Sequence, residues 1–177
     1  MVEKGQADLH TRKVGTVDTL GVDTGACTAW ARAVNARITS CGVIRIELEK
    51  HALARIFPMN PAVCYVERPC YRGGNLRCDP EDLLVLATRV GRVVERLLAD
   101  GHAVHLIRPT DWKGSTPKAL QNERTENALS KRELEGLEQY MGLIPKGERH
   151  NAWDAIGIAL YGLAKQGIQH DATKVAT

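Results

Sequence analysis

The sequence predicts an α/β fold in which one mixed five-stranded β-sheet is flanked by helices. Three short apolar segments come first and have the spacing of antiparallel strands joined by tight turns. A strand–helix–strand pattern over 62–107 follows, and helical patterns then continue to about 163. The 177 residues suit one domain. We expect it at 17–165, with flexible polar tails at 1–16 and 166–177.

Each predicted strand is an apolar run bounded by turn-forming residues. The strands are expected over 17–22, 27–34, 37–47, 62–67 and 103–107. Gly25 permits a tight turn after the first of them. Asn35 and Ala36 separate the second from the third in the manner of a hairpin.

The predicted helices are marked by apolar spacing and by capping residues. They are expected over 49–57, 80–99, 130–141 and 151–163. Asp79 caps the long second helix ahead of Pro80, and Ser130 with Glu133 forms a capping box for the third. The apolar stripe of the second helix is wide enough to serve a dimer contact as well as the sheet. We expect a loop over 108–115, and the polar segment to 125 has no clear assignment.

The composition is that of an ordinary soluble protein, with 44% hydrophobic and 25% charged residues. No apolar run reaches the roughly 18 residues that a membrane span needs. The N-terminus lacks the basic start and apolar stretch of a signal peptide, so we expect a cytoplasmic protein without membrane contact. The net charge of +3 permits binding to nucleic acid without requiring it.

The five cysteines are expected to be reduced thiols, three of them packed as small hydrophobic side chains. Those three are Cys27, Cys41 and Cys64. A zinc site that uses Cys70, Cys78 and a histidine is the alternative, although the spacing is poor for one.

Three acidic residues carry the functional prediction. Asp23 and Glu67 each end an apolar strand, and Asp154 precedes an apolar helical run. Carboxylates in such places are costly to desolvate, and like charges that converge raise one another's pKa. A divalent cation removes the conflict, so the trio predicts a metal site for Mg²⁺, or Mn²⁺ in its place. Two ions about 3.5–4 Å apart would suit phosphodiester hydrolysis.

Two of the acids, and Asn151 near the third, also have a structural interpretation. Asp23 alone is compatible with a cap, Glu67 with a buried pair to Arg68, and Asn151 with the N-cap of the last helix. His150 lies one helical turn before Asp154 and could position or deprotonate a water molecule.

The order of these motifs resembles the RuvC-type Holliday junction resolvases, in particular divergent, phage-type members. The resemblance covers about 17–163 and rests on Gly-Val-Asp-Thr-Gly, Val-Glu-Arg-Pro, a Lys-Gly near 113, a Ser-Lys near 131 and His-Asn-x-x-Asp-Ala-Ile-Gly-Ile-Ala. It implies an RNase H-like mixed five-stranded sheet flanked by helices, a homodimer, and Mg²⁺-dependent nicking of four-way DNA junctions. The location would be the bacterial host cytoplasm if a phage encodes the protein.

The resemblance also implies roles for individual residues. Asp23, Glu67 and Asp154 would be metal ligands. The family's fourth ligand falls on Asn151, with His150 adjacent, so one of these two would take that role. Lys113 and Lys131 match lysines that the family places near the scissile phosphate.

DNA-binding residues are expected in and beyond the loop that follows Glu67. Tyr71 would stack on junction bases or simply pack, and the loop arginines would hold phosphates or be solvated. The expected DNA contacts are Arg68, Tyr71, Arg72, Arg77, Lys113, Lys118, Lys131 and Arg132.

Other functions compete with the DNA nuclease. A YqgF-like RNase acting on structured RNA would share the same sheet and acid order. A DNA-binding or scaffold protein without catalysis would use the acids only as caps. An actin-like ATP-binding protein is suggested by Asp-Thr-Gly alone, but such proteins need a second Gly-rich phosphate loop, which this sequence lacks.

Overall fold

The computed structural model describes residues 18–44, 61–70 and 79–170. Five strands and six helical segments occupy these residues. The strands are β1 (Asp18–Thr24), β2 (Thr28–Val34), β3 (Arg37–Ile44), β4 (Ala62–Glu67) and β5 (Ala103–Ile107). The helices are α2 (Pro80–Ala99), α3 (Pro109–Trp112), α4 (Lys118–Ala128), α5 (Lys131–Leu143), the 3₁₀ turn η1 (Lys146–Glu148) and α6 (Arg149–Lys165).

The strands form one mixed sheet in the order β3-β2-β1-β4-β5. The first three strands are an antiparallel meander, while β4 and β5 run parallel to β1. Asn35 and Ala36 connect β2 to β3 with φ values of 52° and 62°, as a two-residue hairpin turn with a primed geometry requires. The α/β class, the five strands and the flanking helices are therefore confirmed.

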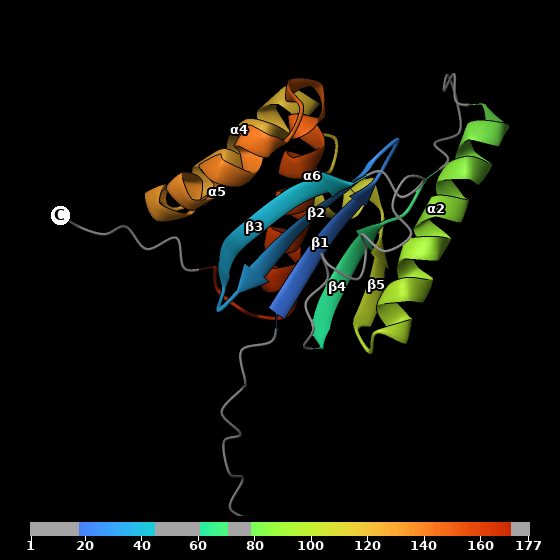
Figure 1. Ribbon diagram of the computed structural model, residues 1–177, viewed down its shortest axis with the longest axis horizontal. Coiled ribbons are helices and arrows are strands. Elements are labelled where there is room, and N and C mark those ends of the chain that lie inside the picture. Colours follow the sequence, from blue (N-terminus) through green and yellow to red (C-terminus); the bar gives the residue numbers. More distant parts are fainter. Residues whose placement is uncertain (1–17, 45–60, 71–78, 171–177) are drawn as a thin grey trace, which may run out of the picture.

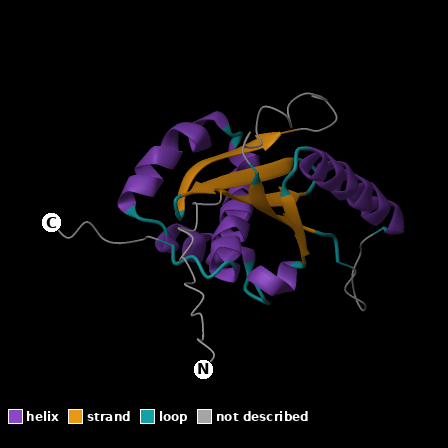
Figure 2. Cartoon of the chain, turned by 90° about the horizontal axis from the view of Figure 1, so that it is seen from below, coloured by secondary structure: helices purple, strands orange, loops and turns teal. Residues whose placement is uncertain are grey.

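Helices cover both faces of the sheet (Figures 1 and 2). The long helix α2 packs Val90, Val93 and Leu97 against one face, where Leu20 and Val22 of β1 lie. The other face is covered by α6, whose alanines pack on the alanines of β2, and α5 continues this layer over β3. Helix α4 lies against α6.

Helix α6 approaches β1 unusually closely because Gly21 faces it. A Cβ atom on Gly21 would lie 2.3 Å from the carbonyl oxygen of Ala155 and 2.4 Å from the backbone nitrogen of Ala159. Any side chain at this position would therefore push the helix off the strand. The contact therefore fixes the distance between α6 and β1.

The caps predicted for two helices are confirmed. Asp79 accepts a hydrogen bond from the Glu81 backbone, and Ser130 with Glu133 forms a reciprocal capping box at the start of α5. Glu133 also accepts hydrogen bonds from the backbone N–H of Ile38 and from His170. It thereby ties α5 to the start of β3.

One prediction about local structure was wrong, and two points that the sequence left open are resolved. The expected loop over 108–115 contains the short helix α3, and the unassigned segment forms α4. Helix α6 begins at Arg149 with Glu148 as its N-cap, so Asn151 lies inside the helix and does not cap it. Helix α6 starts early because the 3₁₀ turn η1 runs directly into it.

Two further predictions concern segments at the limits of the described chain. The helix over 49–57 lies outside the described residues, as do the predicted tail over 1–16 and positions 45–47 of the third strand. The domain boundary at 165 stays a prediction, but Gln166 donates to the Thr19 hydroxyl and His170 contacts Glu133.

In the described residues, Cys27, Cys41 and Cys64 are buried free thiols, as expected. Cys70 is also a free thiol, while Cys78 lies outside the described residues. No helix in the described ranges combines the length and the apolar character needed to cross a bilayer.

Candidate active site

Two of the predicted acids lie side by side where parallel strands end. Val22 of β1 is in register with Val66 of β4, so Asp23 and Glu67 are the next residues of the two strands. The Thr24 hydroxyl donates to the carbonyl oxygen of Glu67 at 3.0 Å and holds the two strand ends together. The carboxyl ends of parallel strands are the usual place for a binding crevice in such sheets.

Both side chains point toward the face that α6 covers. Side chains alternate along a strand, and Gly21 faces Ala155 and Ala159, so Asp23 faces α6 as well. The ring of Tyr65 lies against Gly162 of α6, which puts Glu67, two residues later, on the same face.

Asp154 completes the trio from the helix. It precedes Ala155, whose carbonyl oxygen contacts Gly21, and its side chain is 5% exposed. One carboxylate oxygen, Oδ2, lies 3.2 Å from Nζ of Lys118. The other oxygen, Oδ1, is buried without a hydrogen-bond partner. A buried anionic oxygen without a donor is costly, and a cation is the usual partner that relieves it.

Glu67 is held by two neighbouring residues of the α3 segment. The indole N–H of Trp112 donates to Oε2 at 2.5 Å, and Nζ of Lys113 lies 3.5 Å from the same oxygen. Lys113 also stands over the Trp112 ring, with Nζ 4.7 Å from the ring centroid. These contacts replace the pair between Glu67 and Arg68 that the sequence left open, since the Arg68 side chain is exposed.

The three carboxylates interact electrostatically. The pKa of Asp23 is raised to about 7, chiefly by burial and also by the negative charges of Glu67 and Asp154, while the positive charges of Lys113 and Lys118 oppose the rise. The Asp23 side chain keeps some exposed surface, but it is enclosed enough for desolvation to be the largest cause. Near neutral pH, Asp23 is thus poised between its neutral and its charged form.

The residue types fit a hard divalent cation, although their present arrangement favours lysine. Carboxylate oxygens are the preferred ligands of Mg²⁺, and the unpartnered Oδ1 of Asp154 is available to one. Within the described ranges, however, no three His, Cys, Asp or Glu side chains are grouped closely enough to ligate one ion. The ammonium groups of Lys113 and Lys118 neutralise Glu67 and Asp154 instead. A metal ion would have to take over from them.

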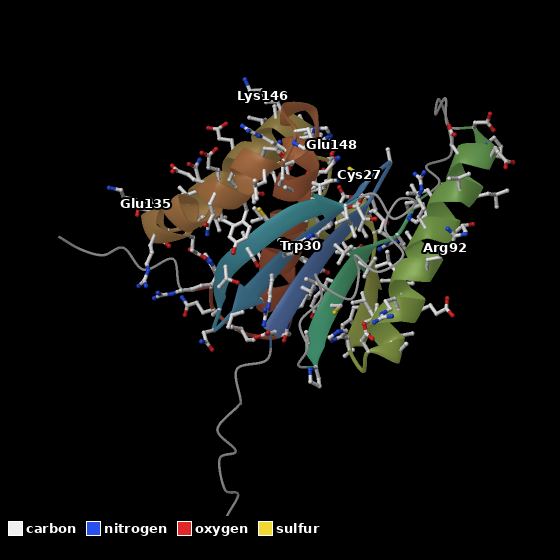
Figure 3. All side chains as sticks on the ribbon, viewed as in Figure 1. Cys27, Trp30, Arg92, Glu135, Lys146 and Glu148 are labelled. Atoms are coloured by element: carbon white, nitrogen blue, oxygen red, sulfur yellow. The ribbon has the colours of Figure 1, made fainter. Side chains whose placement is uncertain are left out.

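The predicted fourth ligands lie at the start of α6. His150 and Asn151 are both half-buried there. The Asn151 amide nitrogen donates to Sγ of Cys27 at 3.1 Å, and burial raises the pKa of that thiol. Cys27 and Glu148 lie at the end of the sheet where β1 ends and α6 begins (Figure 3).

Lys131 is not brought to the carboxylates, which corrects the prediction made for it. It is the first residue of α5, is 91% exposed and lies 3.8 Å from Glu135. Helix α5 begins beside Ile38, at the opposite end of the sheet from Asp23, and Arg132 lies there too. Lys118 is instead the lysine that lies beside Asp154, with Nζ 3.2 Å from Oδ2. The sequence had assigned it only to DNA contact.

The remaining DNA-binding residues stay predictions. Arg68 is exposed directly after β4, and its backbone N–H donates to Ile107. Tyr71, Arg72 and Arg77 lie outside the described residues.

Trp112 was not predicted to belong to the site. Its segment was taken as a loop, and no local pattern links it to Glu67. The available signal was its place directly before Lys113, a residue already assigned to the site.

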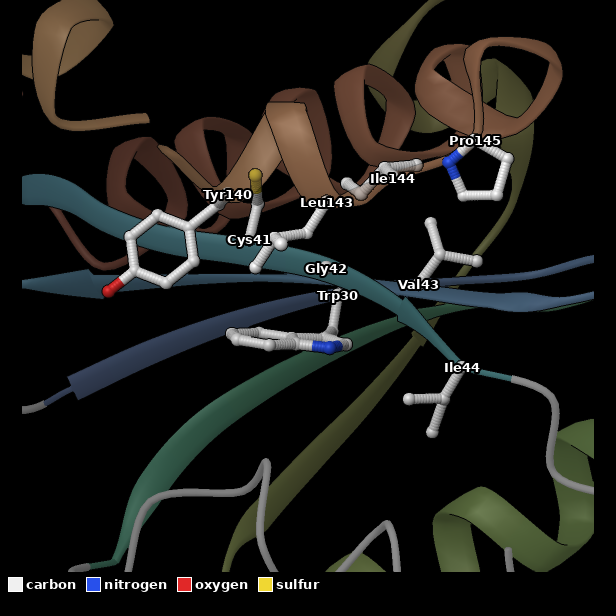
Figure 4. Close-up of a pocket in the computed structure, with 9 residues that line it drawn as sticks. All are labelled: Trp30, Cys41, Gly42, Val43, Ile44, Tyr140, Leu143, Ile144 and Pro145. Atoms are coloured by element: carbon white, nitrogen blue, oxygen red, sulfur yellow. The ribbon is translucent and has the colours of Figure 1, made fainter. Parts of the chain in front are cut away.

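An apolar hollow of about 250 Å³ lies elsewhere, along the edge strand β3 (Figure 4). Trp30, Gly42 and Val43 line it from the sheet, with Tyr140 and Leu143 from α5. It contains no acidic side chain, so it is separate from the carboxylate site.

Comparison with solved structures identifies the architecture. The structure of Thermus thermophilus RuvC superposes with a TM-score of 0.55 at 18% identity and covers 85% of this chain and 97% of that chain. The fold is that of RuvC. The T. thermophilus RuvC complex with a Holliday junction substrate matches over the same shares, with a TM-score of 0.53 and 18% identity. No family model and no curated protein matches the sequence. The resemblance of the motifs to RuvC-type resolvases is thus supported by the three-dimensional fold.

Proposed function

We propose that this protein is a metal-dependent, structure-selective endonuclease that nicks four-way DNA junctions and related branched DNA. The observation that carries the proposal is the convergence, within a RuvC fold, of Asp23, Glu67 and Asp154 on one face at the carboxyl ends of β1 and β4. The RuvC structure solved with a Holliday junction substrate favours branched DNA as the partner.

Asp23, Glu67 and Asp154 would hold Mg²⁺, or Mn²⁺, as a pair of ions. Bound there, the ions would supply an activated water molecule and stabilise the leaving oxygen. Asp23 must give up its proton to serve as a ligand, and because its pKa is raised, protons compete with the metal ion more strongly as the pH falls. His150 or Asn151 would provide a further ligand from α6.

Lys113 and Lys118 would bind DNA phosphates once a metal ion replaces them at the carboxylates. Lys118 is half exposed, so its ammonium group can turn from Asp154 to a DNA phosphate. Lys113 would act in the same way beside Glu67. His150 would position or deprotonate the attacking water from the start of α6. The exposed Arg68 would hold a neighbouring phosphate, with Arg72, Arg77 and Tyr71 contributing from the loop that follows.

Symmetric cutting of a four-way junction needs two sites related by a two-fold axis, so we propose a homodimer. Helix α2 favours this because it buries Val90, Val93 and Leu97 against the sheet and leaves other large apolar side chains exposed. These are Leu84, at 62%, Val85, at 43%, and Leu98, at 55%. We also propose that the protein acts in the cytoplasm, where branched DNA would be available.

The decisive experiment measures nicking of a synthetic four-way junction by the full chain with Mg²⁺, with Mn²⁺ and with EDTA. We expect nicks with either metal and none with EDTA. Asp23→Asn and Asp154→Asn should each lower the rate by about 10²–10³-fold or more while junction binding persists. Asp100→Asn is the matched control, because Asp100 pairs with Arg96 at the far end of α2.

Three substrates presented side by side distinguish the alternatives. A linear duplex of the same sequence should be cut far more slowly than the junction. Preferential cutting of an RNA hairpin would favour a YqgF-like RNase. Binding without cutting on every substrate, in both metals, would leave a non-catalytic DNA-binding protein.

A further inference from the structure

Trp112 connects the two elements that carry Glu67 and Asp154. Its indole N–H donates to Oε2 of Glu67 at 2.5 Å. Its six-membered ring lies against Gly157 of α6, one turn after Asp154. One side chain therefore touches both the end of β4 and the helix that faces it.

The contact with α6 is close enough to fix the ring. A Cβ atom on Gly157 would lie 2.6 Å from Cζ3 and 3.2 Å from Cε3 of Trp112, so only glycine lets the indole come this close. The ring belongs to a small core cluster with Tyr65, Ile107 and Ile158. It is thus clamped between the sheet and α6.

The chemistry of indole makes this contact directional. The indole N–H can only donate a hydrogen bond and does not titrate near neutral pH. It therefore cannot ligate a metal, and it donates to one carboxylate oxygen of Glu67. With Oε2 held by Trp112, Oε1 of Glu67 is the oxygen free to turn toward a cation. Donors to metal-bound carboxylates are known to tune metal affinity in this way.

We infer that Trp112 is a positioning residue that orients the Glu67 carboxylate for the metal and ties it to the helix bearing Asp154. This rests on the proposed function, since it requires Glu67 to be a ligand. The ammonium group of Lys113 also lies over the Trp112 ring, so the same indole helps to position that ammonium group.

Trp112→Phe tests the inference because it keeps an aromatic ring against Gly157 and removes the N–H donor. The measurement is the Kd for Mn²⁺ by titration calorimetry without DNA, followed by kcat and KM for junction nicking. We expect Mn²⁺ binding to weaken and kcat to fall, each by about 10–100-fold, with KM for the junction unchanged. Trp30→Phe is the matched control, since Trp30 packs on Gly42 at the other face of the sheet.

Two further variants separate positioning from packing. Gly157→Ala retains the tryptophan but forces the ring away, so Mn²⁺ binding should weaken to a similar extent. In a Glu67→Gln background, Trp112→Phe should have no further effect on Mn²⁺ affinity, because the group through which it acts is gone. An additive effect there would make Trp112 a packing residue only.

The outcomes distinguish this inference from the proposed function. If the wild type binds Mn²⁺ and Trp112→Phe binds it with the same Kd, the inference is overturned and the nuclease proposal remains intact. If Trp112→Phe does not fold, Gly157→Ala decides, and an unchanged Kd in that variant overturns the inference. A wild-type protein that neither binds Mn²⁺ nor nicks a junction overturns the proposed function itself.

Discussion

Two buried acidic regions of this molecule differ sharply in how their charge is balanced. Glu133 accepts hydrogen bonds at both carboxylate oxygens, from Ile38 and His170 at Oε1 and from Ser130 at Oε2. Burial alone would raise the pKa of Glu133, but these donors lower it to about 2. In the carboxylate site, burial and two neighbouring acids instead raise the pKa of Asp23 to about 7.

The difference shows what each region is arranged for. A carboxylate surrounded by donors stabilises the fold as it stands, whereas acids that repel one another need a proton or a cation to relieve the repulsion. Lys113 and Lys118 supply part of that charge, and Oδ1 of Asp154 remains without a donor. Glu133 is therefore a structural acid, and the trio at the strand ends is the functional candidate.

The largest stability effect is expected at Glu133. Glu133→Gln replaces one accepting oxygen with an amide NH₂ group, which cannot accept the hydrogen bonds donated at that position. The free energy of unfolding should therefore fall by about 2–4 kcal/mol. Chemical denaturation measures the change. Glu135→Gln on the same helix is the control, because its exposed pair with Lys131 should contribute less than about 1 kcal/mol.

Nicking by Glu133→Gln should match the wild type at a temperature where both are folded. If Glu133→Gln lost nicking activity but kept its stability, Glu133 would no longer differ in role from the carboxylate site.

A smaller effect is expected from Gly21→Ala, which separates α6 from β1. The new methyl group would meet backbone atoms of Ala155 and Ala159, so we expect a loss of about 1–3 kcal/mol. Because Asp154 moves away from Asp23 with the helix, Mn²⁺ binding should weaken as well. Gly136→Ala in α5, where a Cβ meets no atom within 4 Å, should be neutral or stabilising. A Gly21→Ala protein that binds Mn²⁺ like the wild type would show that this contact does not set the site.

The pH dependence of stability should reveal the two regions in adjacent windows. Asp23 has a folded pKa of about 7 against an ordinary value of 3.8, so the folded state holds a proton that the unfolded state releases. Its contribution to stability is full below about pH 4 and is lost as the pH rises to about 7. Glu133 acts in the opposite sense, since its pKa is lowered from 4.5 to about 2 and its contribution is lost as the pH falls between these values.

Melting temperatures measured in EDTA should therefore decline from pH 5 to pH 8. Asp23→Asn should flatten that decline, and Mg²⁺ should do the same for the wild type, because a bound cation lowers the pKa of its ligands. A decline that persists unchanged in Asp23→Asn would assign the titration to another group.

The sheet and the long helices were predictable because their patterns are local. The apolar runs of β1 and β4, the caps Asp79 and Ser130, and the stripe of α2 can each be recognised within a few residues. Helix α4 was missed because most of its side chains are polar and Thr125 is its one buried residue. Packing against α6, not an apolar period, keeps it helical.

The candidate site was predictable in its acids and not in its counterions. A carboxylate at the end of an apolar strand is anomalous by itself, so Asp23 and Glu67 stand out in the sequence. The partners of these acids depend on contacts between distant segments. Lys118 reaches Asp154 from the start of α4, and Trp112 reaches Glu67 from α3, two helices that the sequence did not predict.

The smallest effect is expected from Lys118→Met, and it distinguishes a competing counterion from a structural one. The Lys118 ammonium group occupies Oδ2 of Asp154, so a metal ion must displace it. Removing that competition should tighten Mn²⁺ binding by about 2–5-fold, the size of a half-exposed ion pair. Junction nicking should nevertheless slow, because the proposed contact to the phosphate is lost. Lys131→Met, the same change on an exposed lysine paired with Glu135, should alter neither quantity. Weaker Mn²⁺ binding in Lys118→Met would instead mean that this lysine holds Asp154 in place for the metal.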